Sequence, residues 1–119
     1  MPDASIRALL VDDEPLAIER LQILAARLPA LQVVGSAHDA ASALRMIAAL
    51  EPELLLLDIA MPGLTGIELA RQLLTMPNPP LVIFVTAFDS YAVAAFDVAA
   101  VDYLLKPIDP ERLERAISR

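Results

Sequence analysis

The sequence predicts a single α/β domain of the doubly wound (βα)5 type, a five-stranded parallel sheet with helices on both faces. Five short apolar runs of strand length alternate with segments whose apolar residues recur at helical spacing. Most of the links between them are short and contain Pro, Gly or Asp, which commonly end helices and strands. Because parallel strands need crossover connections, usually helices, this alternation indicates a parallel sheet covered on both sides.

The predicted strands are short runs rich in Leu, Val and Ile. The unbroken run Leu54 to Leu57 is apolar at every position, as expected of a central strand that is buried on both faces. In chain order the strands span Ile6 to Val11, Leu31 to Ala37, Glu53 to Asp58, Leu81 to Val85 and Asp102 to Leu105.

Each predicted helix starts at a proline or a capping residue. Proline fits the first turn because its missing N–H costs nothing there, and Asp, Ser and Thr side chains cap free N–H groups. In chain order, the first helix begins at Pro15 and stops before Pro29, and the second runs from Ala40 to Leu50 after the cap Asp39. The third is marked by the capping-box pair Thr65 and Glu68, the fourth runs from near Tyr91 to Val101, and the fifth begins at Asp109-Pro110. In the second helix Leu44, Ile47 and Leu50 are predicted to share a face, and in the last Leu113, Ala116 and Ile117 are predicted to point inward.

Composition narrows the class of protein. The 119 residues suffice for one domain with a sizeable core, and no stretch approaches the ~18 uninterrupted apolar residues of a membrane span. No cationic leader precedes an apolar run, so we expect no signal peptide, no membrane partner and a cytoplasmic location. The absence of cysteine excludes disulfides and thiolate metal sites, and the net charge of −7 argues against nucleic-acid binding by this segment.

Polar residues stand at the ends of four predicted strands. Asp12 and Asp13 follow the first, Asp58 ends the third, Thr86 ends the fourth and Lys106, the only lysine, ends the fifth. The carboxyl ends of parallel strands lie along one edge of the sheet, so we expect these side chains to converge. Asp12 and Asp13 as mere helix-entry acids, or Thr86 as an ordinary strand-end residue, are the simpler alternatives.

Three carboxylates in one crevice repel each other, and a divalent cation relieves that repulsion. An all-oxygen ligand set without Cys or His favours Mg²⁺, with Mn²⁺ as the alternative. The chemistry that these groups suit is phosphoryl transfer onto a carboxylate, with Asp58 as nucleophile and with Thr86 and Lys106 holding phosphoryl oxygens.

The sequence resembles the receiver domain of bacterial two-component response regulators along essentially its whole length, residues 1–119. The stretches that carry the resemblance are Val11-Asp12-Asp13-Glu14, Leu57-Asp58-Ile59-Ala60-Met61-Pro62 through Gly66, Val85-Thr86-Ala87 and Tyr103-Leu104-Leu105-Lys106-Pro107. This resemblance implies the flavodoxin-like form of the (βα)5 fold and a phosphorylation-controlled signalling domain rather than a turnover enzyme.

The resemblance also implies roles for single residues. Asp58 would accept a phosphoryl group from a phosphohistidine on a sensor histidine kinase. Asp13, Asp58 and the backbone carbonyl of Ala60 would ligate Mg²⁺, and Asp12 would act through metal-bound water. The remaining roles fall on the last two strands: Lys106 would pair with the phosphoryl group and form a cis bond to Pro107, Thr86 would swing toward the phosphate, and Tyr103 would turn inward as the second switch residue.

A finer resemblance is to the receivers of LytTR-type transcription regulators. It is carried by Thr86 to Ala92, Ala95-Phe96 and Val101 to Pro107. It implies that the chain is one domain of a longer transcription regulator whose C-terminal DNA-binding domain is absent here, and that DNA is contacted only through that domain.

Two positions depart from what receivers generally place beside the phosphorylation site. Ala60 and Phe88, two residues after Asp58 and after Thr86, are apolar. We expect that neither can orient a hydrolytic water, so that the phosphoryl group is long-lived.

The predicted helix near Tyr91 to Ala100 is apolar nearly all round, which indicates burial or an interface. We expect a phosphorylation-sensitive homodimer surface made by this helix, the fifth strand and the last helix. His38 is interpreted as a surface or loop histidine, and Met61 and Met76 as packing residues.

Three alternatives remain at this point. A haloacid-dehalogenase-like phosphatase would also use a strand-end aspartate and Mg²⁺, but would place a second acid where this chain has Ala60. A stand-alone phosphorelay shuttle would need no output domain. A degenerate receiver is disfavoured because Asp12, Asp13, Asp58, Thr86 and Lys106 are all present.

Overall fold

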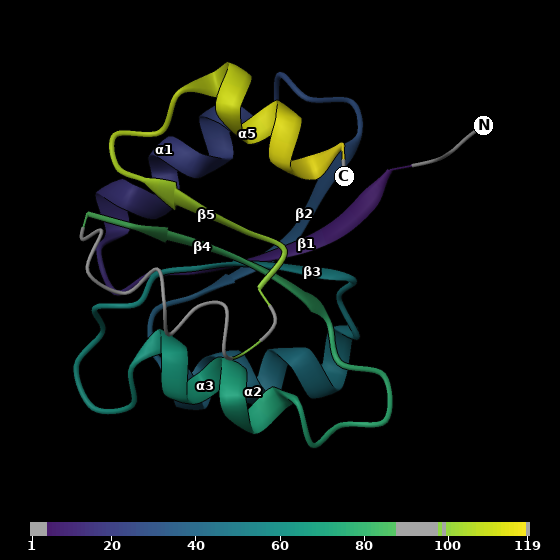
Figure 1. The fold of residues 1–119 in the computed structure, drawn as a ribbon, viewed down its shortest axis with the longest axis vertical. Coiled ribbons are helices and arrows are strands. Elements are labelled where there is room, and N and C mark those ends of the chain that lie inside the picture. The colour runs from purple at the N-terminus through teal and green to yellow at the C-terminus, as the bar shows by residue number, and fades with distance from the viewer. Residues whose placement is uncertain (1–4, 88–97, 99, 119) are drawn as a thin grey trace.

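The computed structural model describes residues 5–87, 98 and 100–118 of the chain. Five parallel strands form one sheet in the order β2-β1-β3-β4-β5, which confirms the predicted fold class. The elements are β1 Ile6–Val11, α1 Pro15–Ala25, β2 Leu31–Ala37, α2 Ala40–Leu50, β3 Leu54–Leu57, α3 Gly66–Leu73, β4 Leu81–Thr86, β5 Asp102–Leu105 and α5 Pro110–Ile117. Helices α1 and α5 cover one face of the sheet, and α2 and α3 cover the other (Figure 1).

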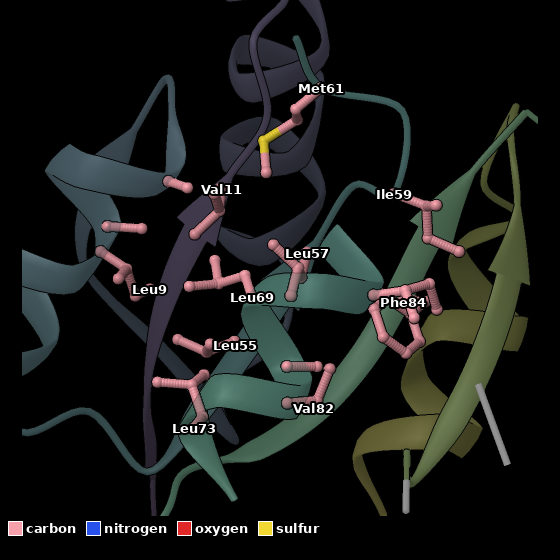
Figure 2. Close-up of a cluster of buried hydrophobic side chains, with 14 of the residues drawn as sticks. Leu9, Val11, Leu55, Leu57, Ile59, Met61, Leu69, Leu73, Val82 and Phe84 are labelled. Atoms are coloured by element: carbon pink, nitrogen blue, oxygen red, sulfur yellow. The ribbon is translucent and has the colours of Figure 1, made fainter. Parts of the chain in front are cut away.

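The core has two layers, one on each face of the sheet. Leu55 and Leu57 of β3 point toward α3 and pack with Leu69 and Leu73 (Figure 2). The alternate residues Leu54 and Leu56 belong to the layer under α1 and α5. Since successive strand side chains point to opposite faces, a strand buried on both faces needs an apolar residue at every position. This is the physical reason for the Leu54–Leu57 run.

Predicted caps are confirmed at three helices. Asp39 accepts a hydrogen bond from the Ser42 N–H, and Asp109 accepts one from the Glu111 N–H. Thr65 and Glu68 form the reciprocal capping box at the start of α3. Each cap satisfies an N–H group that has no partner within its helix.

Several predicted boundaries and faces are wrong in detail. Helix α1 ends at Ala25 instead of continuing to the turn before Pro29, whereas β4 ends at Thr86 as predicted. The buried face of α2 comprises Ala40, Ala43 and Ile47, whereas Leu44 is exposed. Small alanines on this face let α2 pack against the sheet. A prediction based on the spacing of large apolar residues does not identify this face.

Strand β3 is shorter than predicted, but both predicted end residues still bond to β1. The Glu53 N–H donates to the Arg7 carbonyl, and the Asp58 N–H donates to the Val11 carbonyl. Residues 88–97, and with them most of the helix predicted near Tyr91, lie outside the described residues. Ala100 and Val101 are described and are not helical, so the predicted end of that helix at Val101 is wrong. Among the described residues, no helix is long and apolar enough to cross a membrane.

Candidate functional site

The site lies at the carboxyl edge of the sheet, where backbone hydrogen bonds tie each polar residue to a neighbouring strand. The Asp12 N–H donates to the Ala37 carbonyl at 3.1 Å, and the Asp58 N–H donates to the Val11 carbonyl at 2.9 Å. The Lys106 N–H donates to the Thr86 carbonyl at 2.8 Å. The ends of adjacent strands therefore hold these side chains in a fixed relation, and the predicted convergence is confirmed for the three acids and Lys106.

Three carboxylates form the inner part of the site. One oxygen each from Asp12, Asp13 and Asp58 lies within 4.8 Å of the others. Asp12 and Asp58 are 1% and 4% exposed, and Asp13 is half-buried. Hard carboxylate oxygens grouped this closely, without His or Cys, suit a divalent cation of the Mg²⁺ type. The donor set therefore fits the predicted metal.

Lys106 supplies the cation nearest to these acids. Its Nζ lies 2.8 Å from Asp12 Oδ2, 3.5 Å from Glu14 Oε1 and 3.8 Å from Asp58 Oδ2. The shortest contact is with Asp12 rather than with Asp58. The Lys106–Pro107 peptide bond is cis, as the resemblance implies.

Burial raises the pKa of Asp58 from its ordinary value of 3.8 to about 6, and the nearby Asp12 charge adds to the rise. Lys106 and a hydrogen bond from the Ala60 N–H act in the opposite direction. For Lys106 itself burial lowers the pKa, but the hydrogen bond to Asp12 and the charges of Asp58, Asp12 and Glu14 outweigh burial, and the net pKa is raised. Lys106 therefore stays protonated, and it lies beside the Asp58 carboxyl, whose ionised form is disfavoured by burial.

The two predicted switch residues lie on neighbouring strands. Thr86 is completely buried at the end of β4, one residue beyond Val85. Tyr103 in β5 packs against the core layer under α2 and α3, and its ring centroid lies 6.4 Å from that of Phe84. That Tyr103 turns inward when Thr86 moves stays a prediction.

Gly66 is a positioning residue that the sequence reasoning did not single out. A Cβ on Gly66 would lie 2.1 Å from the Asp58 carbonyl oxygen and 2.9 Å from the Ile59 Cα. The Gly66 N–H also donates to the Ile59 carbonyl at 2.9 Å. Only glycine permits this approach of α3 to the end of β3. The glycine directly after the Thr65 cap is the signal that was available.

Glu14 and the Asp102–Arg112 pair were also missed. Glu14 adds a third carboxylate around Lys106, and the third acid after the first strand was visible in the sequence. Arg112 of α5 forks onto both oxygens of Asp102 at 2.9 and 2.7 Å, joining α5 to the start of β5. Nothing in the local pattern marks that pair, because many acids and arginines are present.

The remaining predicted residues behave more simply. Ala60 is exposed, and Phe88 lies outside the described part of the chain. His38 is exposed, as predicted. Met61 is buried in the layer under α2 and α3, and Met76 packs against the same layer, which confirms their packing roles.

The family model described as response regulator receiver domain matches residues 8–118. An uncharacterised response regulatory protein of Vibrio cholerae is 49% identical over 114 residues, covering 95% of this chain and 44% of that protein. The positive alginate biosynthesis regulatory protein of Pseudomonas aeruginosa is 46% identical over 115 residues, covering 96% of this chain and 46% of that protein. The chain thus spans about half the length of these curated relatives.

Solved structures agree in fold. The response regulatory domain of the protein mrkE from Klebsiella pneumoniae superposes with a TM-score of 0.87 at 31% identity, covering 95% of this chain and 93% of that one. The response regulator domain of CheB from Thermotoga maritima gives a TM-score of 0.83 at 31% identity, with 96% and 95% covered.

Proposed function

The chain belongs to the response regulator receiver domain family, and we propose that it accepts a phosphoryl group on Asp58 from a sensor histidine kinase. The observation that carries this proposal is the grouping of three carboxylates and one lysine at the carboxyl edge of the sheet. It supports a signalling domain that catalyses only its own phosphoryl transfer.

Asp58 is the proposed nucleophile. A carboxylate oxygen of Asp58 attacks the phosphorus of a phosphohistidine, the P–O bond forms and the P–N bond breaks. The departing imidazole keeps the bonding electron pair and takes up a proton. The carboxylate must be ionised to attack, which favours a pH above the raised pKa of about 6.

Lys106 and the acids prepare the site for an incoming dianion. Lys106 exchanges part of its contact with carboxylates for a contact with phosphoryl oxygen, and Thr86 donates its hydroxyl to another. Asp13, Asp58 and the Ala60 carbonyl would hold Mg²⁺, with Mn²⁺ as the alternative, and Asp12 would hold its water. The metal, when bound, supplies positive charge that offsets the carboxylates and the phosphoryl oxygens.

The proposed output is a change of surface through Thr86 and Tyr103. Thr86 ends β4 and pairs with Leu105 of the adjacent strand β5, two residues beyond Tyr103. In the proposed switch, a shift of Thr86 changes the space open to Tyr103. The surface affected is β5, α5 and the segment Tyr91 to Ala100, which we propose forms a homodimer after phosphorylation. Scattering of the chain with and without beryllofluoride and Mg²⁺ tests this, and an unchanged monomer at high concentration counts against it.

We further propose that the whole protein is a LytTR-type transcription regulator that works in the cytoplasm. Support comes from the P. aeruginosa alginate regulator and from the transcriptional regulatory protein BtsR of Escherichia coli, which is 42% identical over 96% of this chain. This chain covers 46% and 47% of those two proteins, which leaves room for a C-terminal DNA-binding domain.

The apolar Ala60 supports a long-lived phosphoryl group, since a methyl side chain cannot orient a water. Decay of the acyl phosphate can be followed by intact mass after the donor is removed. Loss within seconds would contradict this part of the proposal.

Phosphorylation by acetyl phosphate with Mg²⁺ tests the central claim. We expect wild type and His38→Gln each to gain one phosphoryl mass, and Asp58→Ala to gain none. His38→Gln is the control for histidine phosphorylation. If wild type gains no phosphate, or Asp58→Ala gains as much, Asp58 is not the acceptor.

A further inference from the structure

Glu14 is the outermost of the three carboxylates around the Lys106 ammonium. It is the N-cap residue of α1, yet its side chain makes no capping hydrogen bond. Its Oε1 instead lies 3.5 Å from Lys106 Nζ. The Glu14 N–H donates to Asp12 Oδ1 at 3.0 Å, so its backbone is held by the same carboxylate that binds Lys106. The Glu14 side chain is therefore turned toward the cation of the site.

The position of Glu14 differs from that of the other two acids. Its side chain is 68% exposed, against 1% for Asp12 and 5% for Asp58. Glu14 and Lys106 also line a groove of about 330 Å³, whose other lining residues are mostly apolar, such as Leu16 and Ile108, and include Arg20. Asp12, Asp13 and Asp58 are not among the residues that line this groove, so Glu14 acts on the site through its contact with Lys106.

We propose, resting on the proposed function, that Glu14 is a specificity-determining residue that disfavours free, strongly anionic phosphodonors at this site. Its negative charge raises the free energy of an incoming dianion, and its contact with Lys106 competes with the phosphoryl oxygens for the same ammonium. A phosphohistidine presented on a protein surface avoids this penalty where that surface carries a cation that pairs with Glu14. Glu14 therefore favours a protein donor of this kind over a small anionic molecule.

The expected effect is modest and sensitive to salt, because an exposed ion pair in water is weak and is screened by counterions. We expect Glu14→Gln and Glu14→Ala to accelerate phosphorylation of Asp58 by acetyl phosphate about two- to fivefold at low ionic strength. The acceleration should shrink toward none at high salt. It should also be smaller with phosphoramidate, which carries less negative charge than acetyl phosphate at neutral pH.

The experiment measures the rate of phosphate gain by intact mass at saturating Mg²⁺. Glu19→Gln is the matched control, since Glu19 is an exposed carboxylate of α1 that does not line the groove. It removes the same charge and should leave the rate unchanged. Matching melting curves for the variants establish that each is folded.

Several results would overturn the inference. They are an unchanged or slower rate in both Glu14 variants, an equal acceleration in Glu19→Gln, or an acceleration that persists at high salt. If wild type gains no phosphate on Asp58, the proposed function fails. If wild type is phosphorylated normally and Glu14→Gln matches it, only the role of Glu14 fails.

Discussion

At the scale of single residues, Asp58 is a carboxylate in a place that disfavours its charge. It is 4% exposed and has Asp12 beside it, and burial with that neighbour raises its pKa to about 6. A side chain that destabilises the fold when ionised is typical of functional sites rather than of cores.

The pH dependence of stability follows from this shift. Below pH 3.8 the Asp58 carboxyl is protonated in both states, so its pKa shift contributes nothing. Between 3.8 and about 6 the unfolded state ionises first, so stability falls as pH rises. Above pH 6 or so the decrease in the free energy of unfolding is complete, at roughly 3 kcal/mol or less.

We therefore expect Asp58→Asn to raise the melting temperature relative to wild type in metal-free buffer above pH 6. The gain should diminish toward pH 4, because the wild-type carboxyl is then neutral. Glu19→Gln serves as the exposed control. A difference in melting temperature between Asp58→Asn and wild type that stays constant from pH 4 to 8 would contradict the raised pKa of Asp58.

At the scale of elements, the junction of β3 and α3 positions Asp58, the proposed phosphorylation site. Gly66 lies against the Asp58 backbone, and the Thr65 capping box sets where α3 begins. The contact is backbone to backbone, so no side-chain rotation can make room for an added methyl group.

Gly66→Ala is expected to destabilise the fold by about 3 kcal/mol or more, because its Cβ would meet the Asp58 carbonyl at 2.1 Å. Gly63→Ala is the informative comparison. Nothing lies within 4 Å of a Cβ there, and only its φ of +78° opposes substitution, at about 1 kcal/mol. Urea unfolding of both variants measures the difference, and equal losses would argue against the close approach.

The ion pair between Arg112 and Asp102 joins α5 to β5. The planar Arg112 guanidinium bonds both Asp102 oxygens, a geometry that lysine cannot reproduce. We expect Arg112→Lys to destabilise the fold by about 1–2 kcal/mol, and Arg115→Lys, on the exposed side of the same helix, to change little. Urea midpoints measure this, and equal values for the two variants would count against the fork.

At the scale of the whole molecule, the proposed metal binding would be coupled to folding. Asp12 and Asp13 follow β1 and Asp58 follows β3, so the unfolded chain does not hold the three carboxylates together. A ligand that binds only the folded state stabilises it by mass action.

Mg²⁺ at about one hundred times its dissociation constant is expected to add about 2.7 kcal/mol to the unfolding free energy of wild type. EDTA should reverse the gain, and Asp13→Asn should show a much smaller one. Because Asp58 must be ionised to bind, the gain should weaken as pH falls through about 6. An equal Mg²⁺ effect in Asp13→Asn would exclude that residue from the site.

The sequence by itself determined the class of fold and most element positions. Apolar periodicity and caps are local properties, and they correctly placed β2, α2 and β5 as well as the Asp39, Thr65 and Asp109 caps. Because the carboxyl ends of parallel strands lie along one edge of the sheet, the sequence also predicted that the three acids and Lys106 lie close together. Boundaries such as the end of α1 at Ala25 were not predicted correctly, because they depend on packing against the sheet.

Only the tertiary structure decided which groups meet. Lys106 and Asp12 are 94 residues apart, and their 2.8 Å contact, with Glu14 as a second partner, depends on how β1 and the end of β5 lie across the sheet. The raised pKa of Asp58 and the need for glycine at Gly66 likewise arise from burial and from backbone approach. These are distances between segments remote in sequence, and no local pattern of residues encodes them.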